Sequence, residues 1–366
     1  MMRNPMDLSA CQATLLALTD PLTGRTLSQD KAQVTCSERG GELVVDLCLA
    51  YPCAREHATW LARVQAALAD QTAGAPLHLN LSHRVIAHKV QGGVQTIPGV
   101  KNVIAVGSGK GGVGKSTVSA NLALALAAQG ARVGLLDADI YGPSVPTLMG
   151  VNAKPQANAD NMMLPLQAHG LQVMSVGFLV PADSALIWRG PMAVQALEQL
   201  FRQTAWDDLD YLIVDLPPGT GDIQLSLAQR MPVTGAVIVT TPQDMALADA
   251  VKAIAMFDKV SVPVLGVAEN MAMYCCPNCG HQEAIFGADG GKAMAAERGL
   301  AYLGALPLNR QIRVDADAGC PTVAADVSSE LSRVYLDLAA QVGASVAKQA
   351  KDYSHAFPSI RVSADT

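Results

Sequence analysis

One glycine-rich stretch constrains this chain more than any other part of its sequence: Gly109-Lys110-Gly111-Gly112-Val113-Gly114-Lys115-Ser116-Thr117. It fits the phosphate-binding P-loop pattern and has an additional lysine, Lys110, inside it. The glycines leave backbone N–H groups free to converge on phosphate oxygens. Lys115 reaches the β- and γ-phosphates, and the Ser116 hydroxyl can coordinate Mg²⁺. A nucleotide is therefore the expected ligand of this loop.

The residues on either side place the loop between a strand and a helix. Val103-Ile104-Ala105-Val106 is a short apolar run rich in β-branched residues, which indicates a buried parallel strand. Residues 116–129 contain alanine, leucine and valine with few polar side chains, and Gly130 follows where a helix C-cap is expected. The phosphates would then lie at a helix N-terminus, where unpaired N–H groups and the helix dipole attract an anion.

Length and charge limit the class of protein. The chain has 366 residues, enough for two domains at about 150 residues each. Half of the residues are apolar, yet no apolar run approaches a membrane span of roughly 18 residues, so no membrane partner is expected. Lys and Arg number 26 against 32 Asp and Glu, a net charge of −6, and the scattered basic residues argue against nucleic acid. Residues 1–7 lack the apolar core of a secretory signal, so we expect a cytoplasmic protein with reduced cysteines.

Alternating strand and helix patterns predict the larger domain. Strand-like runs recur at 133–136, 171–176, 211–214, 236–240, 264–268 and 301–306. Helical stretches separate most of them, which is typical of a doubly wound, mostly parallel α/β sheet. We therefore predict a P-loop NTPase domain over residues 101–349, closed by a long helix over 326–349. A polar tail is expected over residues 350–366.

A smaller domain is predicted ahead of it. Residues 1–87 read as an α+β unit with strands near 32–35 and 42–47 and a helix over 58–69. The polar, glycine-containing stretch over residues 88–100 is typical of an interdomain linker.

Three aspartates follow strand-like runs, at the edge where an open parallel sheet binds its ligands. Asp137 and Asp139 follow one apolar run, and Asp215 follows another. Asp215 has the form of a Walker B aspartate, which would hold Mg²⁺ or its water. Asp139 is our candidate for positioning the attacking water. For Asp137, capping of the next helix is an alternative.

A close pair of cysteines forms the second chemical motif, in Cys275-Cys276-Pro277-Asn278-Cys279-Gly280. The two-residue gap lets the thiolates of Cys276 and Cys279 bind one metal atom or cluster. Cys275 is either a third ligand or an inert neighbour, and the second is favoured because adjacent side chains point in different directions. Spacing alone does not separate zinc from iron–sulfur. A redox dithiol, or ligation by His281, are further alternatives.

This pair supplies only two of the four ligands that iron–sulfur clusters and structural zinc usually take. The other cysteines are dispersed along the chain: Cys11, Cys36, Cys48, Cys53 and Cys320. The simplest source of the other two ligands is the same cysteine pair on a symmetry-related subunit. We therefore expect a homodimer.

The additional lysine leads to the same expectation by a different route. With Lys110, the P-loop resembles the deviant Walker A family of dimeric ATPases, which implies that this lysine contacts the nucleotide of the facing subunit. A cation there would stabilise charge that develops in phosphoryl transfer, as arginine fingers do. A solvated surface lysine is the alternative. Lys110, Lys115 and Asp139 are thus the candidate catalytic residues.

Several motifs in order extend the resemblance. Besides the P-loop and the cysteine pair, they are residues 137–144 (Asp-Ala-Asp-Ile-Tyr-Gly-Pro-Ser), 188–191 (Trp-Arg-Gly-Pro), 215–222 (Asp-Leu-Pro-Pro-Gly-Thr-Gly-Asp) and 269–271 (Glu-Asn-Met). Over residues 98–345 the chain resembles the Mrp/ApbC family of iron–sulfur cluster carrier ATPases. The resemblance implies ATP hydrolysis and a transferable [4Fe–4S] cluster bridged by Cys276 and Cys279. It also implies exchange with cluster-assembly scaffold proteins and apo iron–sulfur proteins, and adenine near Asn270 and residues 307–309.

The first domain resembles the small MIP18-like domain that often precedes this ATPase. The resemblance lies in residues 20–24 (Asp-Pro-Leu-Thr-Gly) and 51–53 (Tyr-Pro-Cys). Leu22 replaces the glutamate of the family's Asp-Pro-Glu pattern, and the glycine before the cysteine turn is absent, so the domain is degenerate. We expect docking or regulation from it rather than a cluster role for Cys53.

Two other classes of ATPase share a P-loop of this kind. A membrane organiser of the division-site type should end in a basic amphipathic helix, whereas residues 347–366 are mixed in charge. A DNA partitioner should display basic patches, which a chain of net charge −6 with scattered basic residues lacks. An electron-transfer relative would bridge its cluster with cysteines from two separate loops. The Cys276–Cys279 spacing favours the carrier.

Overall fold

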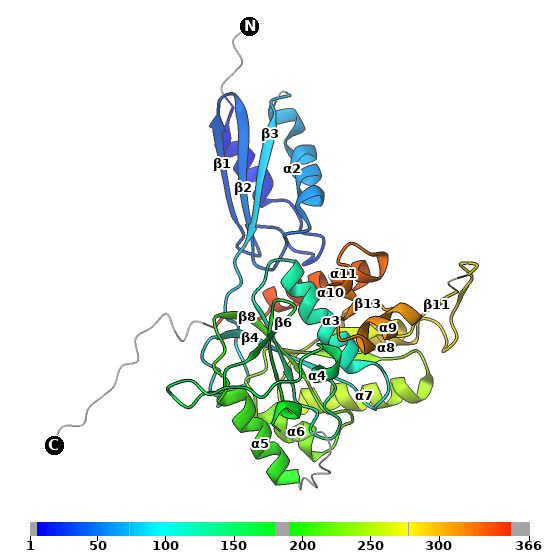
Figure 1. The fold of residues 1–366 in the computed structure, drawn as a ribbon. Coiled ribbons are helices and arrows are strands. Elements are labelled where there is room, and N and C mark those ends of the chain that lie inside the picture. The colour runs from blue at the N-terminus through cyan, green and yellow to red at the C-terminus, as the bar shows by residue number, and fades with distance from the viewer. Residues whose placement is uncertain (1–5, 73, 180–189, 277, 353–366) are drawn as a thin grey trace, which may run out of the picture.

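A sheet of eight strands forms the centre of the larger part of the molecule (Figure 1). The structure is a computed structural model and describes residues 6–72, 74–179, 190–276 and 278–352. The strand order is β13-β10-β9-β4-β8-β5-β7-β6, and all neighbouring pairs are parallel except β6 with β7. The strands are β4 (Val100–Gly107), β5 (Val133–Asp137), β6 (Leu166–Ala168), β7 (Leu171–Ser175), β8 (Leu209–Asp215), β9 (Gly235–Thr240), β10 (Val264–Glu269) and β13 (Tyr302–Ala305). The predicted fold class, a mostly parallel α/β sheet, is confirmed.

Helices cover both faces of this sheet (Figure 1). α3 and α11 pack together on one face, and α7 packs against β9 and β10 beside α6 and α8. The helical segments are α3 (Lys115–Ala128), α4 (Val145–Leu148), η1 (Val176–Phe178), α5 (Gly190–Arg202), α6 (Asp222–Arg230), α7 (Asp244–Lys259), α8 (Gly290–Glu297), α9 (Arg310–Asp317), α10 (Thr322–Ala325) and α11 (Glu330–Ala347). The closing helix α11 begins later than residue 326 because Ser329 caps it, accepting from Ser332 N at 3.1 Å.

The central strands are buried on both faces. Every residue of β5, β8 and β9 is buried, which explains why these strands read as continuous apolar runs instead of alternating ones. Their register aligns the functional edge: Asp215 on β8 lies opposite Asp137 on β5 and opposite Val106 on β4. The aspartates and the P-loop therefore meet at the carboxyl ends of adjacent strands.

A second, smaller sheet is formed by the N-terminal residues. β1 is antiparallel to β2, and β2 is parallel to β3. The elements are α1 (Leu8–Leu16), β1 (Gln33–Arg39), β2 (Glu42–Leu49), α2 (His57–Thr72) and β3 (Leu77–His83). Trp60, Val64 and Leu68 on α2 are spaced at the helical repeat, so all three enter one core. β3 is absent from the strands predicted above.

This smaller unit rests on the C-terminal ends of α3 and α11. Ala54 N donates to Gln129 O and Arg55 N donates to Gln129 Oε1, both at 3.1 Å. Gln129 is the C-cap of α3, and Gly130 follows it with a φ of 101°, as expected of a residue that ends a helix. The smaller unit thus contacts the far end of the helix that follows the P-loop.

The stretch predicted as a linker lies against the larger part of the molecule. His88 is buried, and its Nδ1 lies 2.9 Å from Oδ1 of Asn102. Gln91 Nε2 donates to the carbonyl oxygen of Met231 at 2.5 Å. Of the predicted tail, residues 353–366 lie outside the described residues.

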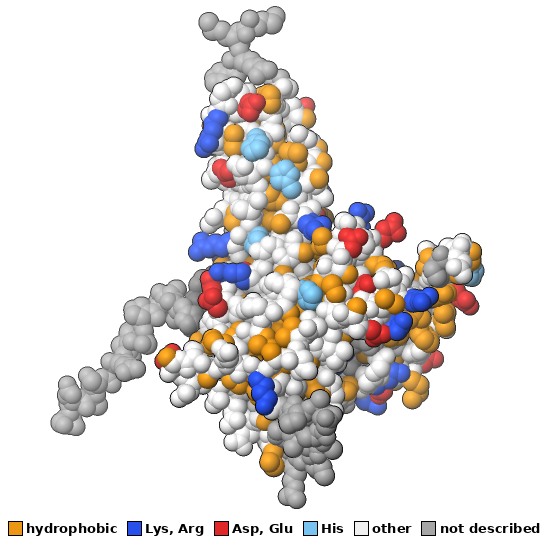
Figure 2. Space-filling model, in the orientation of Figure 1, with side chains coloured by type: hydrophobic (Ala, Val, Ile, Leu, Met, Phe, Trp, Pro, Cys, Tyr) orange, Lys and Arg blue, Asp and Glu red, His pale blue; other side chains and the backbone are white. Residues whose placement is uncertain are grey.

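Charged side chains of both signs are interspersed on the face shown in Figure 2. Within the described residues, no helix combines the length and apolar character needed to cross a bilayer.

Phe257 provides a test of how α7 packs against the central sheet. Its side chain is fully buried on α7, and a Cβ at Gly107, next to the P-loop, would lie 3.0 Å from its ring. Phe257→Ala should lower the free energy of unfolding by about 3–5 kcal/mol because it leaves a cavity under β4. Met245→Ala on the same helix, where the side chain is 74% exposed, should change it by less than about 0.5 kcal/mol. Denaturant unfolding measures both, and equal losses would contradict this packing.

Candidate functional site

The P-loop connects the end of β4 to the first turn of α3. Gly112 and Gly114 have φ angles of 80° and 82°, in the left-handed region that favours glycine. α3 begins at Lys115, and no side chain among the described residues caps its N-terminus. Its first N–H groups are therefore free to bind an anion such as a phosphate group.

At two P-loop positions, the neighbouring atoms leave no room for a side chain, so only glycine fits. A Cβ at Gly109 would lie 2.1 Å from the carbonyl carbon of Asp249 on α7, and one at Gly114 would lie 2.2 Å from Nδ2 of Asn270. Asn270 Nδ2 donates to Val113 O at 2.8 Å, and Asn270 is buried at the end of β10. The loop is therefore held from both sides by neighbouring elements.

Asp215 collects three donors at the carboxyl end of β8. Lys115 Nζ lies 2.7 Å from Oδ1, Ser116 Oγ donates to Oδ2 at 2.5 Å, and Ser119 Oγ donates to Oδ1 at 2.6 Å. Lys115 is 6% exposed and Asp215 is 0% exposed. Buried charges are tolerated when they are paired and hydrogen-bonded, as these are. The structure thus brings Lys115, Ser116 and Asp215 together.

Asp137 has a different environment. It is fully buried and accepts three hydrogen bonds, from Asp139 N (3.0 Å), Ser175 Oγ (2.9 Å) and Val145 N (3.1 Å). Val145 is the first residue of α4, so Asp137 caps that helix, which was the alternative noted for it. Burial, and then the charge of Asp215, raise the pKa of Asp137.

Asp139 lies nearer to solvent at the same edge. It is 9% exposed, and its Oδ1 accepts from Gly142 N at 3.3 Å. Burial raises the pKa of Asp139, the Lys115 ammonium opposes the rise, and Asp215 adds to it. The charges of Lys115 and Asp215 therefore both act on the Asp139 carboxyl.

Lys110 is half-buried within the loop. Its carbonyl oxygen accepts from Ser108 Oγ at 2.9 Å, which fixes the backbone at that point. Among the residues that the structure describes, the Lys110 ammonium has no carboxylate within ion-pair distance.

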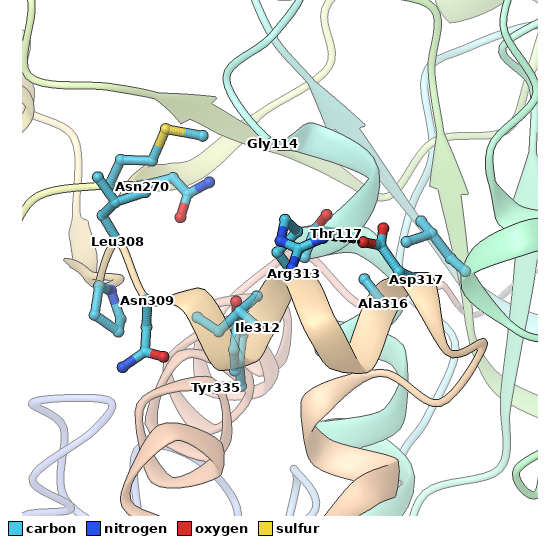
Figure 3. A pocket seen from close by; sticks show the side chains of 13 residues that line it. Gly114, Thr117, Asn270, Leu308, Asn309, Ile312, Arg313, Ala316, Asp317 and Tyr335 are labelled. Atoms are coloured by element: carbon cyan, nitrogen blue, oxygen red, sulfur yellow. Dashed lines mark hydrogen bonds and ion pairs between the residues drawn. The ribbon is translucent and has the colours of Figure 1, made fainter. Parts of the chain in front are cut away.

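A pocket of about 270 Å³ adjoins the P-loop (Figure 3). Gly114 and Thr117 line it from the loop and α3, and Asn270 lines it from the end of β10. The segment 307–309 lines it as well, so the residues expected near adenine surround one cavity. Its size is close to the lower end of small-molecule sites, roughly 300 Å³.

Of the remaining lining residues, Met271 belongs to the motif at residues 269–271, and the others belong to no motif recognised in the sequence. All of them come from α4, α9 and α11 and from the residue after Asn270: Leu148, Met271, Ile312, Arg313, Ala316, Asp317 and Tyr335. These elements are far apart in the chain and meet only in the folded structure. The sequence contained one signal for α9, the helix that carries four of these residues. Asn309 is an N-cap residue type, and its side chain caps α9 by accepting from Gln311 N at 2.7 Å.

The cysteine pair lies on a hairpin that projects from the molecule (Figure 1). Its strands are β11 (Tyr274–Cys275) and β12 (Gln282–Glu283), which pair antiparallel. Cys276 N donates to His281 O at 2.8 Å and Gly280 N donates to Cys276 O at 2.9 Å, so the chain turns tightly between the cysteines. Pro277 lies outside the described residues.

The two cysteines of the pair are accessible. Cys276 is half-buried and Cys279 is exposed. N–H groups of Asn278 and Cys279 lower the pKa of the Cys276 thiol, which favours the thiolate form that binds metals. Within the described part of the chain, no cluster of three or more His, Cys, Asp or Glu residues could hold a metal ion. One chain thus offers two thiols at this hairpin.

The neighbouring cysteine and the dispersed ones differ from this pair. Cys275 Sγ lies 3.8 Å from Gly280 O, within the hairpin itself. Burial raises the pKa of Cys36 to about 11 and that of Cys53 to about 12. Cys11 is buried in the same N-terminal core as Cys53. These thiols have the environment of apolar core residues.

Hydrogen bonds connect the hairpin to the pocket. Leu308 N donates to Met273 O at 2.9 Å, and Tyr274 forms a β-bridge with Leu308. Ala272 N donates to Leu306 O at 3.0 Å. The backbone that lines the pocket and the backbone that begins the hairpin are therefore one ladder.

Two motif residues cannot be placed. Trp188 and Arg189 lie outside the described residues.

In the N-terminal unit, Asp20 is buried and accepts from Tyr51 Oη at 2.7 Å and from Leu22 N at 2.8 Å. Its carboxylate therefore holds the turn at residues 20–24 in place.

Sequence comparison identifies relatives for the larger part of the chain. A family model described as ParA: NUBPL iron-transfer P-loop NTPase matches residues 99–343. The chain is 60% identical over 247 residues to the iron–sulfur cluster carrier protein of Haemophilus influenzae, covering 67% of each chain. It is 54% identical over 274 residues to the Escherichia coli iron–sulfur cluster carrier protein, covering 75% of this chain and 74% of that one. The mouse iron–sulfur cluster transfer protein NUBPL is 52% identical over 248 residues, covering 67% and 78%.

Solved structures share the fold. A nucleotide-binding protein from Archaeoglobus fulgidus, in complex with ADP, has a TM-score of 0.55 and 39% identity, covering 60% of this chain and 87% of that one. The cell division ATPase MinD of Pyrococcus furiosus has a TM-score of 0.51 and 22% identity, covering 66% and 98%, which shows the fold alone.

Gly114 offers a direct test of the loop geometry. Gly114→Ala should lower the free energy of unfolding by about 1–2 kcal/mol from its left-handed backbone alone. It should also weaken nucleotide binding, because the new Cβ displaces the Asn270 amide. At Gly111 the nearest atoms to a Cβ are those of Pro218 at 4.0 Å, so Gly111→Ala should change the stability by less than about 0.5 kcal/mol. Thermal or denaturant unfolding compares the two, and equal stability would contradict the loop geometry.

Proposed function

The chain belongs to the NUBPL iron-transfer P-loop NTPase family, and we propose that it is an ATP-hydrolysing carrier of [4Fe–4S] clusters. The cluster is the cargo, bridged between two copies of the chain by Cys276 and Cys279 of each. Scaffold proteins of cluster assembly supply it in the cytoplasm, and apo iron–sulfur proteins receive it.

One observation carries this proposal: an accessible hairpin presents two thiols, in a chain whose described residues gather no larger group of metal ligands. A [4Fe–4S] cluster usually takes four protein ligands. Two hairpins related by a dyad would supply four thiolates, which meets the number of ligands that the cluster takes. A cargo held at a projecting surface is also open to exchange with a partner protein.

The proposed nucleotide chemistry uses the residues at the sheet edge. The N–H groups of the P-loop and the first turn of α3 bind the phosphates, and the Lys115 ammonium bonds the β- and γ-phosphate oxygens. The Ser116 hydroxyl and the Asp215 carboxylate are hard oxygen donors of the kind Mg²⁺ prefers, and Asp215 already attracts a cation, Lys115. Mg²⁺, when bound, neutralises charge on the phosphate oxygens.

Asp139 is proposed to orient the water. The water oxygen attacks the γ-phosphorus, the bond to the β–γ bridging oxygen breaks, and ADP, inorganic phosphate and one proton leave. Asp139 accepts a hydrogen bond from this water, for which its position beside Lys115 is suitable.

The proposed role of Lys110 is at the partner's nucleotide. Lys110 is half-buried beside the P-loop, and its ammonium has no carboxylate partner among the described residues. In a dimer that joins the two hairpins, this cation would stabilise charge on the phosphates bound by the facing subunit.

We propose the N-terminal residues 1–87, joined through residues 88–100 to the NTPase unit at 101–349, as a docking or regulatory unit. Its contact with Gln129 at the end of α3 supports this, because the other end of α3 binds phosphate. A spatial-organiser or electron-transfer function finds no such support. The fold shared with MinD is compatible with several functions. A spatial organiser has no need of Cys276 and Cys279, and an electron-transfer relative would take its cluster ligands from two separate loops.

Complementation tests the shared nucleotide site. Lys110→Ala and Lys115→Ala should each abolish ATP hydrolysis and still load a cluster, because phosphate and thiolate sites use different residues. Mixed in equal amounts and allowed to exchange subunits, they should recover about a quarter of wild-type phosphate release, since half the dimers contain one intact composite site. The control is Lys115→Ala mixed with the double variant, which should recover nothing. Recovery no greater than this control would place Lys110 within its own chain's site.

Cysteine variants test the cluster site. After anaerobic reconstitution, wild-type protein should bind about four irons per dimer, and Cys276→Ala or Cys279→Ala should bind close to none. Cys275→Ala is the matched control and should retain the cluster, as should Cys53→Ala and Cys320→Ala. ATP hydrolysis should survive in all five variants. Iron and sulfide analysis with an absorbance spectrum gives the result, and cluster loss only in Cys275→Ala would overturn the assignment.

A further inference from the structure

The pocket beside the P-loop contains one charged pair. Of the described side chains that line it, only Arg313 and Asp317 bear a charge. They lie on successive turns of α9, and Arg313 Nη1 donates to Asp317 Oδ2 at 2.5 Å. Both side chains are well exposed, at 65% and 62%, so a ligand in the pocket can reach them.

The pair lies apart from the residues expected near the base. In Figure 3, Asn270, Leu308 and Asn309 lie on one side of the pocket and Asp317 lies on the other, with Thr117 between them. A nucleotide whose phosphates bind at the P-loop has its ribose next to the phosphates and its base beyond the ribose. The asparagine side provides amide groups and an apolar surface for a base, so the charged side is left for the sugar.

An ion pair at this spacing is common on helix surfaces and adds little to stability, about 0.2–0.5 kcal/mol. α9 has a second pair of the same spacing, in which Gln311 Nε2 donates to Asp315 Oδ1 at 2.7 Å. That second pair does not line the pocket. Asp317 and Asp315 therefore have similar contacts on the same helix, but only Asp317 lines the pocket.

The chemistry of the pair suits a sugar. A carboxylate only accepts hydrogen bonds, and the vicinal hydroxyls of a ribose are donors that match it, as in dinucleotide sites where an acidic residue binds the ribose. Arg313 fixes one carboxylate oxygen and offsets its negative charge. Without that guanidinium, the negative charge of a carboxylate in this pocket would oppose the binding of phosphates at the P-loop.

We propose that Asp317, held in place by Arg313, binds the ribose hydroxyls of the nucleotide and makes the site selective for ribonucleotides over deoxyribonucleotides. This inference rests on the proposed function, because it takes the ligand of the P-loop to be ATP. Asp317 contacts the ligand directly, and Arg313 is a positioning residue.

Competitive binding of ATP, 2′-deoxy-ATP and 3′-deoxy-ATP tests the proposal on the full chain. Wild-type protein should bind at least one deoxy analogue about tenfold more weakly than ATP, because a hydrogen bond to a charged group is lost. In Asp317→Asn the preference should fall below about twofold, since an amide is a weaker acceptor than a carboxylate. Asp315→Asn is the matched control on the same helix and should keep the wild-type preference. Thermal unfolding without nucleotide should be alike in both variants, since Asp317 is exposed, Asp315 is half-buried, and Asn has nearly the size and shape of Asp.

Three outcomes would overturn the proposal. The first is wild-type protein that binds all three nucleotides equally, and the second is a preference that persists in Asp317→Asn. The third is that Asp317→Asn changes the preference for ATP over inosine triphosphate instead, which would assign Asp317 to the amino group of the base. Nucleotide binding that is absent, or insensitive to Lys115→Ala, would instead contradict the proposed function.

Discussion

The buried contact between Lys115 and Asp215 organises the nucleotide end of this molecule. Two opposite charges are withdrawn from water there, and the arrangement is tolerable because Ser116 and Ser119 complete the hydrogen bonds of the carboxylate. The contact exists only because β4, which leads into the P-loop, lies beside β8, which ends in Asp215. In the proposed site, a triphosphate would compete with Asp215 for the same ammonium and so change the electrostatics of the sheet edge.

A continuous backbone ladder connects that edge to the cysteine hairpin. Asn270 holds the P-loop through Val113 and lines the pocket, and the chain that follows it pairs with residues 306–308 before entering the hairpin. The pocket beside the P-loop and the cysteine hairpin thus share their supporting residues.

Elements whose structure depends on a local sequence pattern could be predicted from the sequence. The P-loop and the buried strands β5, β8 and β9 were read from glycine positions and apolar runs, which reflect local backbone and burial requirements. β3 was missed although Leu77, Leu79 and Leu81 alternate with polar residues, a recognisable strand pattern. Arg313 and Asp317 were beyond reach, because their nearness to the P-loop depends on how α9 packs and not on any motif.

The central claim is that one chain holds half of the cluster site. Native mass spectrometry of anaerobically reconstituted wild-type protein tests it most directly, because it counts chains and clusters in the same particle. We predict a dimer of two chains with one [4Fe–4S] cluster, and loss of the mass of that cluster after treatment with a chelator. A single chain that retains a whole cluster, a dimer with one cluster in each chain, or zinc in place of iron would contradict it.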